Sequence, residues 1–196
     1  EPPLKTCEGR LKHGSILNGN IGLRRVSSQW KSTPIASLTT GSLSRIVHYD
    51  GATGKAKAQY VYPVSPIPQA AIKSNGSNDN GLSEMVALDD HHLIAVERSF
   101  AQGFGNTVKL FMLDVRDATD VTGIAELEKS EKVIVPIRKA QILDLRAIGL
   151  VPDNIEAMAI GKAKDGTDIL ILAADNNFSA SQKNQFYAFR IKKPAS

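Results

Sequence analysis

Two segments of the chain carry acidic residues at matching places. Glu84 aligns with Glu156 near the start of one short apolar stretch, and Glu97 aligns with Asp175 at the end of the next. Clustered carboxylates repel one another unless a proton or a cation joins them, and their oxygens suit hard cations such as Ca²⁺ or Mg²⁺. The pattern therefore predicts that these carboxylates hold a divalent cation, Ca²⁺ or Mg²⁺. We expect its ligands to be Glu84, Glu97, Glu156 and Asp175.

Polar residues beside the second acidic position are candidates for substrate binding. Arg98 follows Glu97, and a guanidinium can hold a carboxylate or a phosphate through two hydrogen bonds. Asn176 and Asn177 follow Asp175, where they offer oxygens to a cation or caps to a loop. We expect Glu84, Glu156 and Arg98 to be catalytic, and Arg98, Asn176 and Asn177 to bind substrate.

Each of these residues also has an ordinary structural interpretation. A glutamate can cap a turn or pair with a basic residue of its own segment, and Asp and Asn are common turn residues. Nucleophilic catalysis by serine is not favoured, because the chain lacks a Gly-x-Ser-x-Gly motif and no histidine is tied by spacing to a serine.

The acidic residues lie on short strands that recur along the chain. Residues 81–114 and 154–191 each contain two apolar strands and then a third, at 109–114 and 186–190. A repeat of roughly 70 residues built from short strands is typical of propeller blades. A sandwich also uses strands at this spacing, but the repeated unit favours an all-β partial propeller. In a propeller the innermost strand of each blade lines the channel. If the first strands of the two units are innermost, Glu84 and Glu156 would meet there.

A third unit precedes these two. Residues 43–49 and 58–62 are rich in β-forming side chains, and the glycines of 50–55 predict a hairpin turn. Pro63, Pro66 and Pro68 should end its pairing, because proline cannot donate to a sheet. A short helix is possible at 115–131, where Ile124 and Leu127 are spaced i, i+3. Residues 133–137 read as an extended piece and 141–145 as a strand.

About three blades are visible, whereas a closed propeller uses four to eight. We therefore expect an open side with unpaired sheet edges through which chains can associate. Residues 41–193 form the propeller portion, and residues 1–40 are either an irregular arm or a degenerate blade.

Composition narrows the class of protein. The chain has 196 residues, 42% of them hydrophobic, and a net charge of +4, so it can bury a core. Its basic residues are scattered, which does not favour nucleic-acid binding, and no apolar run reaches the length of a membrane span. The single cysteine, Cys7, excludes an internal disulfide and a cysteine-based zinc cluster.

Several motifs occur in the order found in one known family. Residues 154–161, 170–179 and 185–189 resemble the C-terminal signature of the phytase-like esterases, and residues 82–88, 93–98, 139–145 and 45–50 fit the same family. Ala157 stands where that family usually has glycine. The resemblance covers about 43–191 and implies a bacterial, secreted or periplasmic β-propeller with esterase-like activity of phytase. It predicts a hydrolase acting on a small phosphoester or ester. The alternative is a non-catalytic propeller that binds a ligand or protein.

Overall fold

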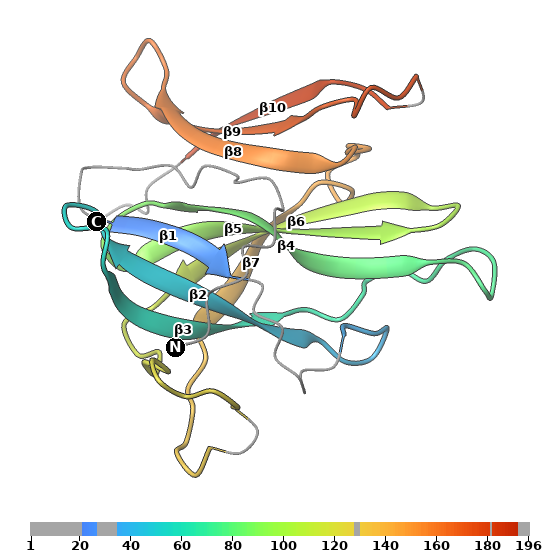
Figure 1. Cartoon of the computed structure of the whole chain (residues 1–196). Coiled ribbons are helices and arrows are strands. Elements are labelled where there is room, and N and C mark those ends of the chain that lie inside the picture. Colours follow the sequence, from blue (N-terminus) through green and yellow to red (C-terminus); the bar gives the residue numbers. More distant parts are fainter. Residues whose placement is uncertain (1–20, 27–34, 128–129, 181, 192–196) are drawn as a thin grey trace.

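The computed structural model describes residues 21–26, 35–127, 130–180 and 182–191. These residues form ten β-strands and no helix, as Figure 1 shows. The all-β class is thus confirmed. The first sheet, sheet A, contains β1 (Ile21–Val26), β2 (Ser42–Asp50) and β3 (Ala56–Val64). Sheet B contains β4 (Asn78–Ala87), β5 (His92–Ala101), β6 (Gly105–Asp114) and β7 (Arg138–Asp144). Sheet C contains β8 (Ile155–Lys162), β9 (Asp168–Ala174) and β10 (Gln185–Arg190).

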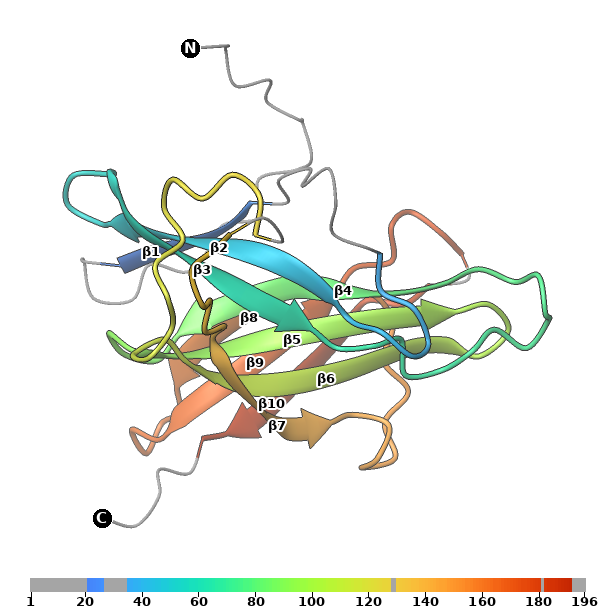
Figure 2. The ribbon, with the colours of Figure 1, turned by 90° about the horizontal axis from the view of Figure 1, so that it is seen from below.

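Every sheet is antiparallel, and its strands follow one another in chain order. None of the three sheets closes on itself. The first strand of sheet B, β4, lies beside β8 and also contacts β1. The first strands of the three sheets are thus neighbours, and Figures 1 and 2 show the remaining strands extending from them.

The hairpin of β2 and β3 forms as predicted. The carboxylate of Asp50 accepts hydrogen bonds from the backbone N–H groups of Ala52 and Thr53, at 3.0 and 2.8 Å. Gly54 has a φ of 68°, which glycine adopts without steric cost. The prediction that Pro63 ends the pairing is wrong, because Pro63 pairs with Leu43 and β3 continues to Val64. The position tolerates proline because β3 is the edge strand of sheet A.

The repeat is confirmed as two antiparallel three-stranded units, but its alignment shifts by one residue. β4 and β8 each contain a bulge, where the register with the next strand shifts between Leu82 and Glu84 and between Ile155 and Ala157. The residues before the bulges, Leu82 and Ile155, are both fully buried. Glu156 therefore corresponds to Ser83, and Glu84 corresponds to Ala157.

The second strands show the same shift. Leu82 pairs with Glu97, whereas Ile155 pairs with Ala174, so the counterpart of Glu97 is Ala174 rather than Asp175. The expected equivalence of the acidic residues is wrong. Short strands rich in alanine and valine fit either of two alignments, and a bulge decides between them by adding one residue to one strand.

The segment between β6 and β7 contains no helix in its described part. Val121 is fully buried, and its N–H donates to the carbonyl of Gln59 on β3 at 2.8 Å. The predicted strand at 141–145 is found as β7, which begins three residues earlier and pairs with β6. The expectations for Cys7 and for most of residues 1–40 lie outside the described residues. Within that range, β1 adds a strand to sheet A.

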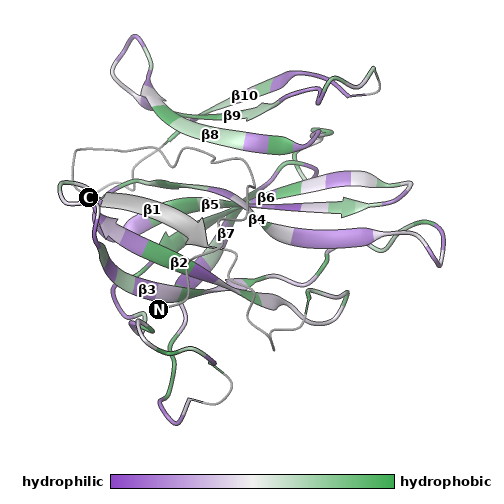
Figure 3. Ribbon diagram, viewed as in Figure 1, coloured by the Kyte–Doolittle hydropathy of each residue, from purple (hydrophilic) through white to green (hydrophobic). Residues whose placement is uncertain are grey.

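Two apolar layers hold the sheets together, one on each face of sheet B. The first layer contains Tyr62 of sheet A with Met85, Ala95 and Leu113 of sheet B. The second contains Val96 and Leu110 of sheet B with residues of sheet C, namely Ile155, Met158, Leu170 and Leu172. Figure 3 shows hydrophobic positions within the strands of all three sheets. The described residues include no helix long and apolar enough to cross a membrane.

Candidate functional site

Glu97 lies on β5 between sheets A and B, and its side chain is 2% exposed. Its carboxylate accepts a hydrogen bond from the Tyr62 hydroxyl at 2.8 Å, from the Ser65 backbone N–H at 3.1 Å and from the Asn80 amide at 3.1 Å. Lys139 at the start of β7 donates to the same carboxylate at 2.6 Å. Three chain segments, 62–65, β4 and β7, thus converge on one buried charge of β5, which fixes how sheet A sits on sheet B.

All three protons of the Lys139 ammonium are donated within this network. It donates to Glu97, to the hydroxyl of Ser65 at 2.8 Å and to the carbonyl of Pro63 at 2.5 Å. It also lies 4.4 Å from the centre of the Phe111 ring, within the range of a cation–π contact. An ammonium has three protons and all three have acceptors, so Lys139 is not placed to take a proton from Ser65.

The surroundings shift two pKa values in opposite directions. Burial by itself raises the pKa of Glu97, but the hydrogen bond and charge of Lys139, with the bonds from Tyr62 and Ser65, outweigh it and leave this pKa below its ordinary value. Burial, followed by the adjacent Glu97 charge, raises the pKa of Tyr62. Glu97 is therefore ionised and Tyr62 neutral at physiological pH, as their hydrogen bond requires.

A small cavity adjoins Glu97, lined partly by Asn80, Ser99, Thr107 and Lys109. Its volume of about 20 Å³ accommodates about one water molecule. The cavity is too small for a phosphoester. Because protein donors already occupy the carboxylate of Glu97 beside the cavity, Glu97 is a structural ion-pair partner.

Arg98, the next residue on β5, faces the other way and reaches sheet C. Its guanidinium donates to the side-chain oxygen of Asn154, just before β8, and the amide of Asn154 donates to Glu156 at 2.8 Å. The Nε of Arg98 is buried and has no hydrogen-bond partner. A buried donor without a partner calls for an acceptor such as water or an anion. Arg98, Asn154 and Glu156, which we call the junction site, thus combine a cation with spare donor capacity and a carboxylate.

Glu84 lies on β4, the strand beside β8. Its carboxylate accepts a hydrogen bond from the N–H of Met85 at 2.9 Å. The tertiary structure thus places the strands of Glu84 and Glu156 next to each other, although the two residues are not equivalent in the repeat. Glu97 belongs to the network with Lys139 instead.

Asp175 and the two asparagines form a turn after β9. The Asp175 carboxylate accepts a hydrogen bond from the N–H of Asn177 at 3.0 Å, and the N–H of Asn176 donates to the side chain of Asn184 at 2.8 Å. Asn177 and Phe178 have positive φ values of 46° and 56°. These contacts match the turn-forming role of Asp and Asn. The described residues contain no group of three or more His, Cys, Asp or Glu side chains that could hold a metal ion.

Lys139 and Asn154 are among the residues of these networks that the sequence does not reveal. In the sequence, Lys139 is one of several scattered basic residues, and Asn154 belongs to a family motif that gives it no role of its own. Neither carries a local signal, because Lys139 finds Glu97 across 42 residues and Asn154 finds Arg98 across 56. The bridging position of Asn154 exists only once sheets B and C are packed.

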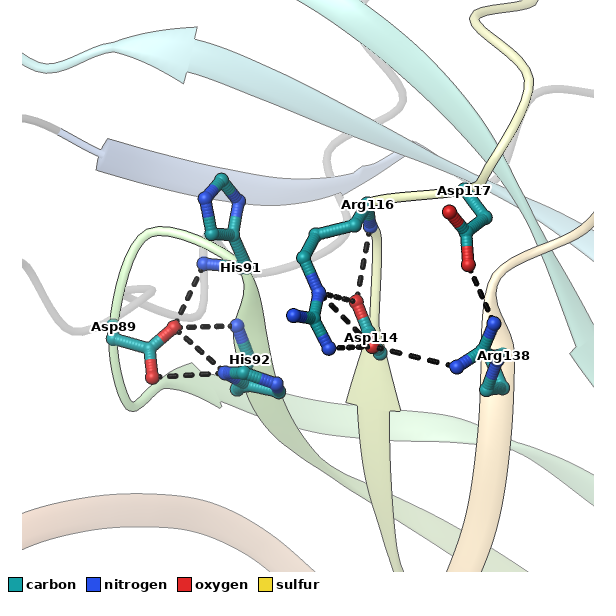
Figure 4. A network of polar contacts seen from close by, with 7 residues as sticks. All are labelled: Asp89, His91, His92, Asp114, Arg116, Asp117 and Arg138. Carbon is teal, nitrogen blue, oxygen red and sulfur yellow. Dashed lines mark hydrogen bonds and ion pairs between the residues drawn. The ribbon is translucent and has the colours of Figure 1, made fainter.

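A further network of charges lies at the opposite end of sheet B (Figure 4). Arg116 donates to Asp114 at 2.6 Å, Arg138 donates to Asp117 at 2.5 Å, and His92 lies 2.9 Å from Asp89. Hydrogen bonds from Arg116 hold the pKa of Asp114 well below its ordinary range. Each of these acidic groups has a basic partner, so the network joins the turns between strands.

The fold and these sites define an all-β protein of consecutive antiparallel sheets with polar networks at the sheet junctions. The family model described as "Phytase-like: Esterase-like activity of phytase" matches residues 26–178. The chain therefore belongs to the phytase-like family, which confirms the resemblance seen in the sequence. Searches among curated proteins and among solved structures found no match.

Proposed function

We propose that this chain contributes three blades of a β-propeller and hydrolyses a small phosphoester or ester at the junction site. The proposal is supported by membership of a family described by an esterase-like activity of phytase. The observation that carries it is the partly buried Arg98, whose Nε lacks a partner while Asn154 links its guanidinium to Glu156. The neighbouring first strands β1, β4 and β8 support the arrangement as blades around an axis.

The chemistry follows from the residues of the junction. Arg98 binds an anionic oxygen of the substrate through its spare donors, which also stabilise the charge that grows on that oxygen as water attacks. The attacking water loses its proton to a nearby carboxylate, for which Glu156 and Glu84 are the candidates. The water oxygen forms the new bond to phosphorus or carbon, the ester bond breaks, and the alcohol leaves with a proton.

Ca²⁺ remains part of the proposal, with Glu84 and Glu156 as its carboxylate ligands. Glu97 and Asp175 fit this role less well. Protein donors occupy the carboxylate of Glu97, and the carboxylate of Asp175 accepts a hydrogen bond within a turn. Ca²⁺ takes 6–8 oxygen ligands, so two carboxylates would need carbonyl, water or substrate oxygens as well. When bound, the ion would supply positive charge next to a substrate phosphate. We also propose a periplasmic or secreted location, in keeping with the resemblance to secreted family members.

An assay with chromogenic phosphate and carboxylate esters tests the proposal. We expect turnover by the unmodified chain, and Arg98→Lys should lower kcat/KM by at least about tenfold, because lysine cannot form the two-pronged contact. Glu156→Gln should lower kcat, because it keeps the shape and removes the negative charge. Arg190→Gln is the matched control, since Arg190 is exposed and pairs with Asp165 at 2.7 Å, away from the junction.

The calcium assignment is a separate arm of the same assay. Added chelator should lower turnover, and Glu156→Gln should raise the Ca²⁺ concentration needed for half-maximal activity. Turnover unaffected by chelator contradicts the Ca²⁺ assignment alone. No turnover of any ester, or equal turnover by Arg98→Lys and Arg190→Gln, contradicts the hydrolase and favours a propeller that binds a ligand or protein without catalysis.

A further inference from the structure

An exposed aromatic residue follows Arg98 on the same face of β5. Side chains two residues apart on a strand share a face, and their positions are separated by roughly 6.5 Å. Val96, two residues before Arg98, packs against sheet C, so Arg98 and Phe100 face the same way. Phe100 is 37% exposed. An apolar ring in contact with water is therefore the next side chain beyond the guanidinium on this face.

The position beside Arg98 on β4 is open. Gly81 pairs with Arg98 in the register of β4 and β5, and directly opposite residues point to the same face of a sheet. A Cβ added to Gly81 would meet nothing within 4 Å. Gly81 does not have a positive φ, so its backbone conformation does not require glycine. What the glycine provides here is open space next to Arg98.

The order of residues along the two strands runs from apolar to anionic. Phe100 lies nearest the end of β5, Arg98 comes next with Gly81 opposite it, and Glu84 follows further along β4, where it pairs with Val96. A molecule lying along this face would meet the ring first, then the guanidinium and then a carboxylate. The arrangement suits an ester whose apolar group stays near the end of the sheet while its reacting bond lies further in.

The charges along this face provide no surplus of positive charge. Asp79 pairs with Phe100, and its carboxylate accepts a hydrogen bond from the N–H of Phe100 at 3.0 Å. With Glu84 and Glu156, three carboxylates accompany the guanidinium of Arg98, and a Ca²⁺ bound there would bring the sum of these charges to zero. Like charges placed together oppose binding. A substrate with one anionic oxygen therefore fits better than a polyanion.

We propose that the junction site takes an ester or phosphoester of an alcohol that carries an apolar ring, and that Phe100 and Gly81 set this preference. An oxygen of the substrate binds Arg98, while the ring lies against Phe100 and extends over the space that Gly81 leaves. Two aromatic rings attract each other through packing and through their quadrupoles. This inference rests on the proposed hydrolase and adds the class of its substrate.

Kinetics with 2-naphthyl and phenyl esters test the preference, because the two alcohols differ in apolar area and little in acidity. The measured quantity is the ratio of kcat/KM for the naphthyl ester to kcat/KM for the phenyl ester, so that the reactivity of each ester cancels between variants. Phe100→Ala should lower this ratio by about three- to tenfold, chiefly through KM, and Phe100→Tyr should retain it. Gly81→Val should also lower the ratio, because it fills the open space from the neighbouring strand.

Phe104→Ala is the matched control. Phe104 is 38% exposed, close to the exposure of Phe100, but it lies in the turn after β5, where its ring centre is 4.2 Å from the guanidinium carbon of Arg146. Its removal should leave the ratio unchanged. Circular dichroism checks that each variant keeps its sheets, and Gly81→Val probes the same contact if Phe100→Ala does not fold.

Phosphonates that cannot be hydrolysed separate this inference from the proposed activity. In titration calorimetry, 2-naphthylphosphonate should bind more tightly than methylphosphonate, and Phe100→Ala should remove the difference. Such binding without turnover of any ester supports the ring contact and contradicts hydrolysis alone. Turnover with the same ratio in Phe100→Ala, Phe104→Ala and the unmodified chain supports the hydrolase and overturns the substrate class. Equal binding of the two phosphonates overturns it as well.

Discussion

At the scale of single residues, the adjacent pair Glu97 and Arg98 points to opposite sides of β5. Glu97 is enclosed with Lys139 between sheets A and B, while Arg98 reaches Asn154 in front of sheet C. Successive residues of a strand face opposite ways, so two neighbouring charges serve different interfaces. Glu97 has its hydrogen-bonding capacity filled and Arg98 does not. This difference is why we assign the first to stability and the second to ligand binding.

Glu97 should make stability depend on pH. Its pKa is lowered in the folded chain, so its contribution is complete above the ordinary pKa of about 4.3 and is lost as the pH falls through the lowered value. Glu97→Gln should reduce the free energy of unfolding by about 3–5 kcal/mol at pH 7, because it leaves Lys139 charged and buried without its partner. The deficit relative to the unmodified chain should shrink below about pH 4.

Urea denaturation at a series of pH values measures this difference. Asp165→Asn serves as the control, because Asp165 is 55% exposed in its pair with Arg190 and should change stability little at any pH. A Glu97→Gln deficit that stays constant from pH 7 to pH 3 would contradict the lowered pKa.

At the scale of elements, β-bulges and close contacts between backbone segments position the strands. The bulges in β4 and β8 lie at equivalent points of the two units, so the units are related even though their acidic residues are not aligned. The bulge of β8 falls on Glu156 itself, and Asn154 lies just ahead of it. A bulge re-aims side chains and commonly lies beside functional sites, which agrees with the junction site.

Gly41 provides a test at this scale, because it leads into β2 where the chain passes close to the end of β3. A Cβ added to Gly41 would lie 2.1 Å from the carbonyl oxygen of Val64. Gly41→Ala should therefore cost about 1–3 kcal/mol through forced displacement of the backbone.

Gly81 on β4 is the matched control, since an added Cβ there meets nothing within 4 Å. Gly81→Ala should be neutral or slightly stabilising, because it restricts the unfolded chain. Thermal or urea unfolding compares the two, and equal stability of both variants would mean that the approach of Val64 is looser than described.

At the scale of the whole molecule, sheet B is the centre because both of its faces are buried. Leu113 and Leu110 lie on opposite faces of β6 and are 0% and 1% exposed, the first packed with sheet A residues and the second with sheet C residues. Sheet C packs against sheet B on one face. Within the described residues, sheet B is therefore the sheet that packs against another sheet on each of its faces.

Truncating each leucine in a separate variant tests whether the two apolar layers contribute equally to the stability of the fold. Leu110→Ala and Leu113→Ala should each lower the free energy of unfolding by about 2–5 kcal/mol, because each removes buried methyl groups and leaves a cavity. Ile171→Ala should cost far less, because Ile171 is 39% exposed. A Leu110→Ala variant as stable as Ile171→Ala would show that sheet C does not pack on sheet B as described.

Much of this protein follows from its sequence alone. The all-β class, the two three-stranded units and the hairpin of β2 and β3 are local properties, written in strand-length apolar runs and in the glycines of the turns. Family membership follows from motifs in order along the chain, and the family match confirms it. The chemistry of Arg98 and Glu156 marks both as candidates in the sequence, and the structure links them through Asn154.

Only the tertiary structure decided which of the acidic residues lie together. Glu97 looked equivalent to Asp175 because both precede a phenylalanine, yet Glu97 pairs with Lys139 from a distant strand while Asp175 forms a turn. A bulge adds one residue without changing the apolar pattern, so the sequence cannot reveal which residue it falls on. Contacts across 42 and 56 residues depend on how whole sheets pack, and no local spacing encodes them.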